Sequence, residues 1–533
     1  MNALILMLSP LIPLLLACFA YRLQSRWWLF AAALPALYLG LMGEQGSAIT
    51  LPWLMLGMHF SLDSIAQQFL LFGAMIWMLA SLYIPGRDLL PGASGYRKQS
   101  FLLAMAGNLL LIIAADMLTF YVGFALMGLS AYGLIWGPSQ RARKVARVYL
   151  VFTLIGELAL FSALLLLLLV NSQSLLFAEL HTESLPQAAV ALLLLGFGIK
   201  VALPGLHLWL PGAYTLAPIF GVALLSGPMM KAGLLGWLRF LPLGEPIDPL
   251  WGNLLLLLGV GGVVLGMLVG MFQREPRSVL AYSSISKMGL FSALIGFTLN
   301  HPGMVDVLLP VIVLLALHHL MVKPMLFMGL DLWQKGAAAH WLLPALTLLC
   351  LSLMAFPMTG GGAVKNLMSV ALNDNLAWLL FLGGIAATLL MSRFLWLLWN
   401  SKQSAEYDRL TLSAWLVVLP LAIWAPFAWD GMSVKASALL PLLSAAVLLL
   451  IGQLLRRRFD LLQQPMFSQG NPMSWRIPTL AGESDKAESG WQRVKRLRQR
   501  HLQGLARWPV MGLRDTAVWW LMLMLLLALA LRN

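Results

Sequence analysis

The sequence predicts an all-α polytopic membrane protein. Hydrophobic residues make up 60% of the 533 residues and charged residues only 11%, a composition that soluble domains of this length do not have. Apolar runs long enough to cross a bilayer, about 20 residues each, recur along the chain. The net charge of +14 would suit nucleic-acid binding in a soluble protein. Here the basic residues lie between the apolar runs, where they set membrane topology, so we expect lipid around the chain and no nucleic-acid partner.

The apolar runs place sixteen spans. They lie near residues 3–21, 26–42, 64–84, 100–116, 118–136, 147–171, 186–212, 218–241, 251–272, 278–298, 304–333, 341–373, 376–399, 411–428, 434–455 and 515–532. Every second connection is basic, whereas those between hold acids and almost no Lys or Arg. This alternation puts the basic connections in the cytoplasm and both termini outside it. We expect a multi-pass protein of a bacterial-type cytoplasmic membrane.

The chain carries no signature of a soluble enzyme. Residues 1–22 lack a basic start and a small-residue cleavage site, so we expect a first membrane helix and not a removable signal. Cys18 and Cys350 lie in apolar runs far apart in sequence, which predicts buried thiols and not a disulfide or metal pair. Nucleotide loops and nucleophile elbows do not occur. We expect no metal, no cofactor and no redox chemistry in this chain.

Three spans, at 186–212, 304–333 and 341–373, are longer than a straight crossing requires. Each contains proline, which removes a backbone donor and crowds the preceding turn. The prolines are Pro204, Pro310, Pro324 and Pro357. Freed backbone groups cannot face lipid, so broken helices line cavities or ion paths. We expect discontinuous helices here, above all the seventh at Pro204 and the twelfth at Pro357.

The order of the spans suggests two copies of one five-span unit, at 100–241 and 251–399. The broken spans occupy matching places in them, and an odd number of spans makes the copies inverted. The remaining parts are 1–99 with the first three spans, 400–455 with additional spans, 456–514 as a basic cytoplasmic segment and 515–533 as a C-terminal span.

The basic segment contains an expected amphipathic helix at 491–507. Its apolar face consists of Trp491, Val494, Leu497, Leu502 and Leu505. Arginines cover the other face, so attraction to anionic lipid at the cytoplasmic surface explains it most simply. Clamping of a partner subunit is the alternative.

Eight ionisable side chains stand in the middle of spans, where a bare charge costs several kcal/mol. They are Glu157, Lys200, Lys231, Lys287, His318, His319, Lys323 and Lys365. A set at one depth in neighbouring helices is what a lateral chain of proton-holding sites requires, because each site must respond to the charge of the next. Lys200 and Lys231 are the strongest candidates, since neither can easily reach the membrane surface.

The other candidates have structural alternatives. Glu157 could be a structural ion-pair acid, and Lys287 could simply bond neighbouring serines. His318 and His319 point about 100° apart, so we expect only one of them to face the path. His319 is preferred because it lies one turn before Lys323. His207, near the end of the seventh span, suits loop packing or a gate.

Four segments carry a recognisable pattern. They are LHLWLPGAYTLAPIFGVALLSGPMMKAGLLGWLRF (206–240), LAYSSISKMG (280–289), HHLMVKPMLFMG (318–329) and FPMTGGGAVKN (356–366). Together, over about residues 60–430, they resemble the antiporter-like, proton-translocating subunits of respiratory complex I, Mrp-type cation/proton antiporters and membrane-bound group 4 hydrogenases. The resemblance implies a fold of fourteen helices with two inverted five-helix repeats. Helices at 434–455 and 515–532 would be additions.

The resemblance also implies roles for single residues. Lys200 corresponds to the central lysine of the seventh helix and Lys231 to the connecting site of the eighth. His319 and Lys323 correspond to connectors of the eleventh helix, and Lys365 to the terminal site of the twelfth. The implied partners are other membrane subunits, homologous antiporter-like subunits among them, and transported H⁺ or Na⁺.

The chain departs from the family pattern at three positions. In DMLTFYVGFALMGLSAYGLI (116–135), Ala125 stands where the family has the acid that partners the seventh-helix lysine. Gly212 stands where an acid is common, and Lys287 where histidine is usual. Glu157 on the neighbouring helix would be the substitute, so our hypothesis is that it interacts with Lys200 directly or through water.

Three functions remain open. The first is an ion-translocating subunit, with the energy source, redox or other, in its partners; a proton-translocating oxidoreductase such as NADH:quinone oxidoreductase or a membrane-bound hydrogenase would be such a complex. The second is a structural or anion-handling subunit that has lost coupled pumping, as Ala125 allows. The third is a free-standing cation/proton antiporter.

Overall fold

The computed structural model describes residues 2–54, 56–90, 95–170, 175–180, 185–337, 339–372, 376–401, 407–425 and 441–448. All of them belong to one structural unit, Met1–Asn471. The expected amphipathic helix and the expected C-terminal span lie outside the described residues, as does most of the span at 434–455.

Each of the first fourteen expected spans overlaps a helix or a set of helices in the described part of the chain. The first seven helices are α1 (Asn2–Cys18), α2 (Arg26–Ala31), α3 (Leu34–Met42), α4 (Ser64–Leu82), α5 (Tyr96–Ile113), α6 (Met117–Ile135) and α7 (Gln140–Val170). They are followed by α8 (Gln187–Val201), α9 (Trp209–Leu216), α10 (Ile219–Leu224), α11 (Met230–Phe240), α12 (Pro249–Met271), α13 (Pro276–Asn300), α14 (Val305–Gln334), α15 (Ala339–Leu353), α16 (Gly360–Leu372), α17 (Ala377–Trp399) and α18 (Arg409–Trp424).

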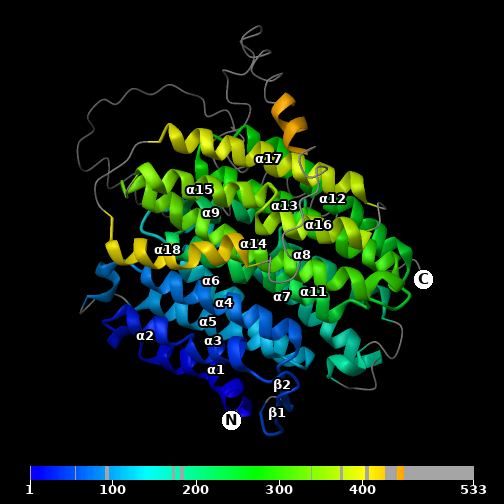
Figure 1. Ribbon diagram of the computed structural model, residues 1–533. Helices are drawn as coiled ribbons and strands as arrows, with labels where there is room; N and C mark the ends of the chain where they lie inside the picture. The colour runs from blue at the N-terminus through cyan, green and yellow to red at the C-terminus, as the bar shows by residue number, and fades with distance from the viewer. Residues whose placement is uncertain are drawn as a thin grey trace, which may run out of the picture. The chain divides into compact units, whose positions relative to one another are not determined.

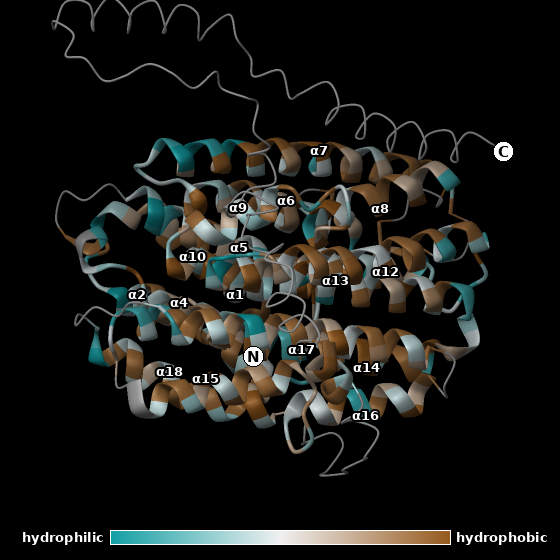
Figure 2. Ribbon diagram, turned by 90° about the horizontal axis from the view of Figure 1, so that it is seen from above, coloured by the Kyte–Doolittle hydropathy of each residue, from teal (hydrophilic) through white to brown (hydrophobic). Residues whose placement is uncertain are grey.

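The helices lie side by side with their ends toward two opposite faces (Figure 1). Polar residues gather at these two ends, and hydrophobic residues fill the stretches between them (Figure 2). Among the described residues, eight helices are long and apolar enough to cross a membrane, and several shorter apolar helices accompany them. The predicted all-α, multi-pass membrane architecture is confirmed.

The predicted breaks at Pro204 and Pro357 are confirmed, and the two have the same backbone geometry. After α8 and after α15 an alanine, Ala202 or Ala355, takes a left-handed conformation with φ 59°. The next N–H then reaches back five residues, from Leu203 to the Gly198 carbonyl and from Phe356 to the Leu351 carbonyl, at 3.0 Å in both. These bonds satisfy carbonyls that the interrupted helices would leave open.

The prediction of a break in the eleventh span is wrong. Helix α14 runs continuously through Pro310 and Pro324, because membrane helices tolerate proline where neighbouring helices cover the bend. The eighth span, for which no break was predicted, is interrupted between α10 and α11 by a π-helical turn, Leu225–Met229. Gly227 has non-helical angles there (φ −89°, ψ −109°), immediately before Pro228.

The π-helical turn of the eighth span packs against Pro324 of α14. A Cβ added to Gly227 would lie 2.6 Å from Pro324 Cγ and 3.2 Å from the Leu320 carbonyl oxygen. A side chain therefore does not fit at residue 227, and the interrupted helix closes directly on the proline of α14.

Other boundaries differ from the sequence expectation. Helix α7 begins at Gln140, so Arg141, Arg143 and Lys144, which lie between the expected spans 118–136 and 147–171, are on its first turns. Lys98, also expected in a loop, is buried in α5 and donates to the Leu23 carbonyl at 2.6 Å. The thiol of Cys350 is buried as expected, whereas Cys18 is exposed, because its position at the end of α1 faces outward.

A β-hairpin that the sequence did not predict follows α3. Strands β1 (Ala48–Leu51) and β2 (Met58–Ser61) pair antiparallel. The fully buried Asp116 holds β2 to the start of α6, since its carboxylate accepts from the backbone N–H groups of His59 and Thr119 and from the Thr119 hydroxyl.

Each of the two predicted five-span units begins with a helix pair in backbone contact. A Cβ added to Gly107 of α5 would lie 2.4 Å from the Met127 nitrogen of α6, and one added to Gly259 of α12 would lie 2.4 Å from the Ala293 nitrogen of α13. Such close approach at small residues is typical of membrane helix pairs. The division into two inverted units itself stays a prediction.

Candidate functional site

Lys200 lies in the last turn of α8, beside the first helix break, and its side chain is buried. The ammonium group donates to the Tyr149 hydroxyl of α7 at 3.0 Å, and Tyr149 in turn donates to the Gly128 carbonyl of α6 at 2.8 Å. A cation at the C-terminal end of a helix is also favoured by the helix dipole. The structure therefore gives this lysine a neutral partner that the sequence analysis did not identify.

Glu157 of α7 lies near the same point of α6. A Cβ added to Gly128 would lie 2.9 Å from Glu157 Oε1 and 3.8 Å from Lys200 Nζ. The two charged groups nevertheless form no ion pair, and Glu157 Oε2 is buried without a hydrogen-bond partner among the described residues. The direct form of the predicted Lys200–Glu157 contact is thus not seen, while the water-bridged form stays a prediction.

The break after α8 is held by Trp209, the first residue of α9. Its indole N–H donates to the Ile199 carbonyl at 2.9 Å, so an acceptor freed by the break, next to Lys200, is satisfied. His207 is buried within the break. Its Nδ1 is buried without a hydrogen-bond partner among the described residues, and its expected role as a gate stays a prediction.

Lys231 of α11 uses the irregular eighth span. Its ammonium group donates to the Ser226 carbonyl at 2.9 Å and lies 2.6 Å from His319 Nδ1 of α14. The neighbouring Leu225 carbonyl accepts from the Tyr214 hydroxyl at 3.0 Å. The π-helical turn therefore exposes two successive carbonyls, and one of them positions Lys231 toward the second half of the chain.

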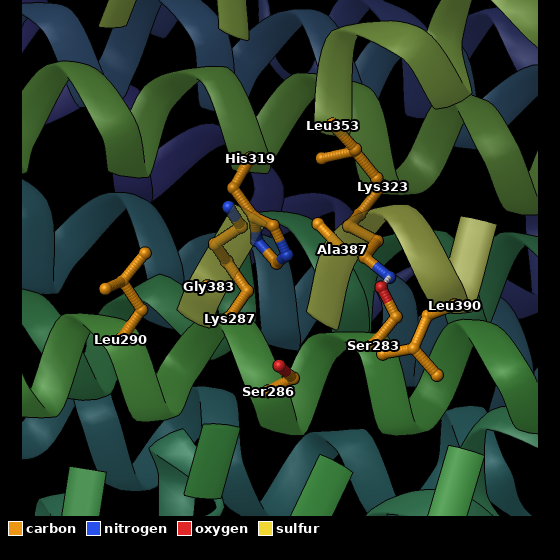
Figure 3. Close-up of a pocket in the computed structure, with 10 residues that line it drawn as sticks. All are labelled: Ser283, Ser286, Lys287, Leu290, His319, Lys323, Leu353, Gly383, Ala387 and Leu390. Atoms are coloured by element: carbon orange, nitrogen blue, oxygen red, sulfur yellow. Dashed lines mark hydrogen bonds between the residues drawn. The ribbon is translucent and has the colours of Figure 1, made fainter. Parts of the chain in front are cut away.

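A first cavity joins α13 and α14 (Figure 3). Lys287 reaches into it from α13, while His319 and Lys323 enter from α14. The fully buried Lys323 donates to the Ser283 hydroxyl and to the Leu280 carbonyl, both at 2.8 Å. The serine bond considered for Lys287 is thus made by Lys323.

A second cavity continues toward α16. Its volume is about 40 Å³, and its polar lining consists of Lys287, His318, Ser352 and Lys365. A site needs roughly 10–15 Å³ to hold a water molecule, so this cavity can be hydrated. His318 Nε2 lies 2.8 Å from the Ser352 hydroxyl. Lys287 is the ionisable residue that the two linings share.

Both histidines join the predicted residues, although only His319 was expected to. They point in different directions from α14, as consecutive helical residues must. His319 faces Lys231 and the first cavity, whereas His318 faces Ser352 and the second. Polar groups lie on both sides of α14, because this helix stands between Lys231 with the first cavity and Ser352 with the second.

The chain of polar groups divides into two described groups. Glu157, Lys200 and Tyr149 form one, and the residues from Lys231 to Lys365 form the other. Between them, α8 and α11 touch at Gly233, whose added Cβ would lie 3.0 Å from Lys200 Cβ. No hydrogen bond between described residues joins the groups, so a connection between them requires water or side-chain movement.

Several hydrogen-bond partners of the ionisable residues were not predicted from the sequence. Ser283 and Ser352 lie inside or beside the motifs that were singled out, but serine is too common in membrane helices to be informative. Tyr149 is a single tyrosine in an apolar run, which does not indicate a role. The sequence SGP at 226–228 was a usable signal for the irregular eighth span. Among the described residues, no three His, Cys, Asp or Glu side chains come together as metal ligands would.

Comparison with known proteins places these features in context. The family described as NADH:quinone oxidoreductase/Mrp antiporter, TM, matches residues 114–390, which include every predicted pathway residue. Hydrogenase-4 component B of Escherichia coli is 30% identical over 50% of this chain and 43% of its own length. NADH-ubiquinone oxidoreductase chain 4 of Tetraodon nigroviridis is 29% identical over 45% of this chain and 54% of its own. The chain thus spans about half the length of these relatives.

Two solved structures share the fold. One is the Mrp complex from a Dietzia species, with a TM-score of 0.70 and 20% identity over 99% of this chain and 62% of the other. The second is the membrane-bound sulfane sulfur reductase, an archaeal respiratory membrane complex, with a TM-score of 0.64 and 19% identity over 86% of this chain and 96% of the other. At these identities the likeness concerns the fold alone.

Proposed function

Because this chain belongs to the NADH:quinone oxidoreductase/Mrp antiporter transmembrane family, we propose that it translocates protons as one antiporter-like subunit of a larger membrane complex. The path runs through Glu157, Lys200, Lys231, Lys287, His319, Lys323 and Lys365, with His318 as a further member. These groups can hold or release protons, and burial in neighbouring helices couples the charge of each to the next. Na⁺ is the alternative ion.

The observation that carries this proposal is the contact between Lys231 and His319. Lys231 Nζ and His319 Nδ1 lie 2.6 Å apart. The contact therefore joins the eighth span to the eleventh, which belong to different predicted five-span units. A proton can cross such a contact without a water molecule. Lys231 also donates to the Ser226 carbonyl, as a structural lysine in a membrane would, so the contact with a second ionisable side chain is what distinguishes it.

The partners follow from the relatives. The proteins compared above are subunits of multi-subunit membrane complexes. We therefore expect homologous antiporter-like subunits and an energy-supplying partner, in a bacterial-type cytoplasmic membrane.

Flux measurements on the full chain, in liposomes that contain a pH-sensitive dye, test the proposal. An imposed potential should drive proton entry in the wild type and in Lys335→Ala, whose exposed lysine pairs with Asp331 at the end of α14. Lys231→Ala should abolish the flux. Equal flux in all three proteins would refute the assignment, and mass spectrometry of the co-purified complex identifies the partners.

A structural or anion-handling subunit is the second candidate. Lys200 has a neutral partner and the acid of the family pattern is replaced by Ala125, so the first group has lost its usual switching pair. If this candidate is correct, the wild type and all variants should give no dye signal. If the chain is instead a free-standing antiporter, a Na⁺ gradient should drive proton flux without any co-purified subunit.

A further inference from the structure

Asn108 of α5 is a buried polar side chain that the proposed path does not use. Its Oδ1 accepts from the Trp77 indole N–H of α4 at 2.9 Å, and its Nδ2 lies 3.5 Å from the Met127 sulfur of α6. A thioether is only a weak acceptor, whereas an amide offers two lone pairs on oxygen and two N–H donors. Among the described residues, this amide therefore keeps an acceptor position and a donor position that no strong partner takes.

Lys231 faces the same small cavity as Asn108, between α4, α5, α11 and α14. The other lining residues are apolar, Phe69, Ile112 and Leu320 among them. An ammonium group has three donors, and Lys231 uses two of them, toward the Ser226 carbonyl and His319 Nδ1. The cavity has no room for a water molecule. On this side Asn108 is thus the polar group within the lining that Lys231 can reach, and it must reach it directly.

Asn108 also lies toward the first group of ionisable residues. Met127, which its amide contacts, is followed by Gly128 on α6. A Cβ added to Gly128 would lie 2.9 Å from Glu157 Oε1 and 3.8 Å from Lys200 Nζ. Asn108 therefore stands between Lys231 and the segment of α6 against which the first group packs.

An amide can pair with either protonation state of a lysine. Charged Lys231 can donate to Oδ1, and after it has passed a proton to His319 Nδ1 its free lone pair can accept from Nδ2. A histidine protonated on both nitrogens accepts no hydrogen bond, so His319 then no longer holds Lys231 as it does here. The flexible four-carbon stem of lysine allows the amino group to turn away.

We propose that Asn108 is a positioning residue, the second partner of Lys231, to which the lysine turns when His319 is protonated and where it takes up the next proton from the first group. The inference rests on the proposed function and deepens it. It assigns the side-chain movement that the gap between the two groups requires to Lys231, and its destination to Asn108.

Thermal midpoints of the full chain in detergent test the partnership without any flux. His319→Leu leaves Lys231 with Asn108, and Asn108→Leu leaves it with His319. The double variant should therefore lose more of its midpoint than the two single losses together, because residues that share a partner couple. In a Lys231→Met background the same two losses should add. Additivity in the presence of Lys231 would overturn the proposal, as would coupling that persists without it.

Proton flux in liposomes covers a double variant that fails to fold. A hydrogen bond to a charged group contributes about 1.5–3 kcal/mol, so Asn108→Leu should slow flux by roughly tenfold. Trp77→Phe removes the indole donor to Oδ1 and should keep wild-type flux, as should Asn253→Leu at the exposed start of α12.

Equal losses in Trp77→Phe and Asn108→Leu would mean that Asn108 only holds α4 against α5, and would refute the positioning role. Thermal coupling that depends on Lys231, in a wild type that shows no proton flux, would support the partnership and count against the proposed function alone.

Discussion

The Lys231 ammonium group of α11 and the His319 ring of α14 lie 2.6 Å apart, although 88 residues separate them in sequence. When Lys231 is charged it has no acceptor, and in that state Nδ1 accepts and the ring hydrogen resides on Nε2. His319 Nε2 is buried and without a partner among the described residues, and the ring lines the first cavity. A proton received at Nδ1 can thus leave from Nε2 toward Lys287 and Lys323.

His319→Gln should interrupt this transfer. Glutamine keeps polarity and nearly the same size but does not take up and release a proton, and removal of a proton-transfer group costs roughly 10²-fold in rate. Dye-detected flux in liposomes measures the loss. His301→Gln, at the exposed end of α13, is the matched control and should transport normally. Wild-type flux in His319→Gln would remove the histidine from the path.

The Tyr149 hydroxyl should determine how readily the Lys200 ammonium group moves between Tyr149 and Glu157. Tyr149→Phe removes the acceptor at 3.0 Å and keeps the ring that packs edge-on against Trp209. A hydrogen bond to a charged group contributes about 1.5–3 kcal/mol, so we expect Lys200 to turn toward Glu157 and flux to change by roughly tenfold.

A double-mutant cycle with Glu157→Gln makes this prediction specific. If Lys200 alternates between the two partners, the double variant should differ from the sum of the single variants, because contacting residues couple. Tyr132→Phe, a phenol removed elsewhere on α6, should leave flux unchanged. Strict additivity of Tyr149→Phe and Glu157→Gln would show that Lys200 does not connect them.

Much of the fold could be predicted because its causes are local. Apolar length fixed the spans, and Pro204 and Pro357 marked true breaks, each stabilised by bonds within five residues of the chain. The break predicted at Pro324 was wrong because the effect of this proline depends on its neighbour: Gly227 of the eighth span packs against it. The eighth span is interrupted and α14 is not, a difference that depends on tertiary packing.

The site was predictable in its ionisable residues and not in their pairing. A charge in mid-membrane is conspicuous in any sequence, so Lys231 and His319 could be identified separately. Their contact joins distant helices, and the carbonyl that positions Lys231 becomes available only through the π-helical turn. Neutral partners such as Tyr149 leave no comparable signal in a chain rich in apolar and aromatic residues.

Asp116→Ala should destabilise the protein without touching the path. Asp116 caps α6 and accepts three hydrogen bonds, one of them from β2. Loss of a cap and of buried partners costs about 3 kcal/mol, visible as a lower thermal midpoint in detergent. Asp306→Ala, an exposed acid in the first turn of α14, should cost at most about 1 kcal/mol. Equal midpoints for both variants would contradict this role.

Gly361→Ala should displace α16 and with it Lys365. The added Cβ would lie 1.7 Å from the Ser352 carbonyl oxygen, a backbone atom that cannot rotate away, so the helix start must move. Overpacking of this kind costs about 1–3 kcal/mol, and we expect a lower thermal midpoint together with reduced proton flux. Gly73→Ala inside α4 is the matched control: nothing lies within 4 Å of its added Cβ, and alanine favours a helix by about 1 kcal/mol, so its midpoint should stay or rise. A Gly361→Ala protein with unchanged midpoint and flux would show that the contact between α16 and Ser352 does not position Lys365.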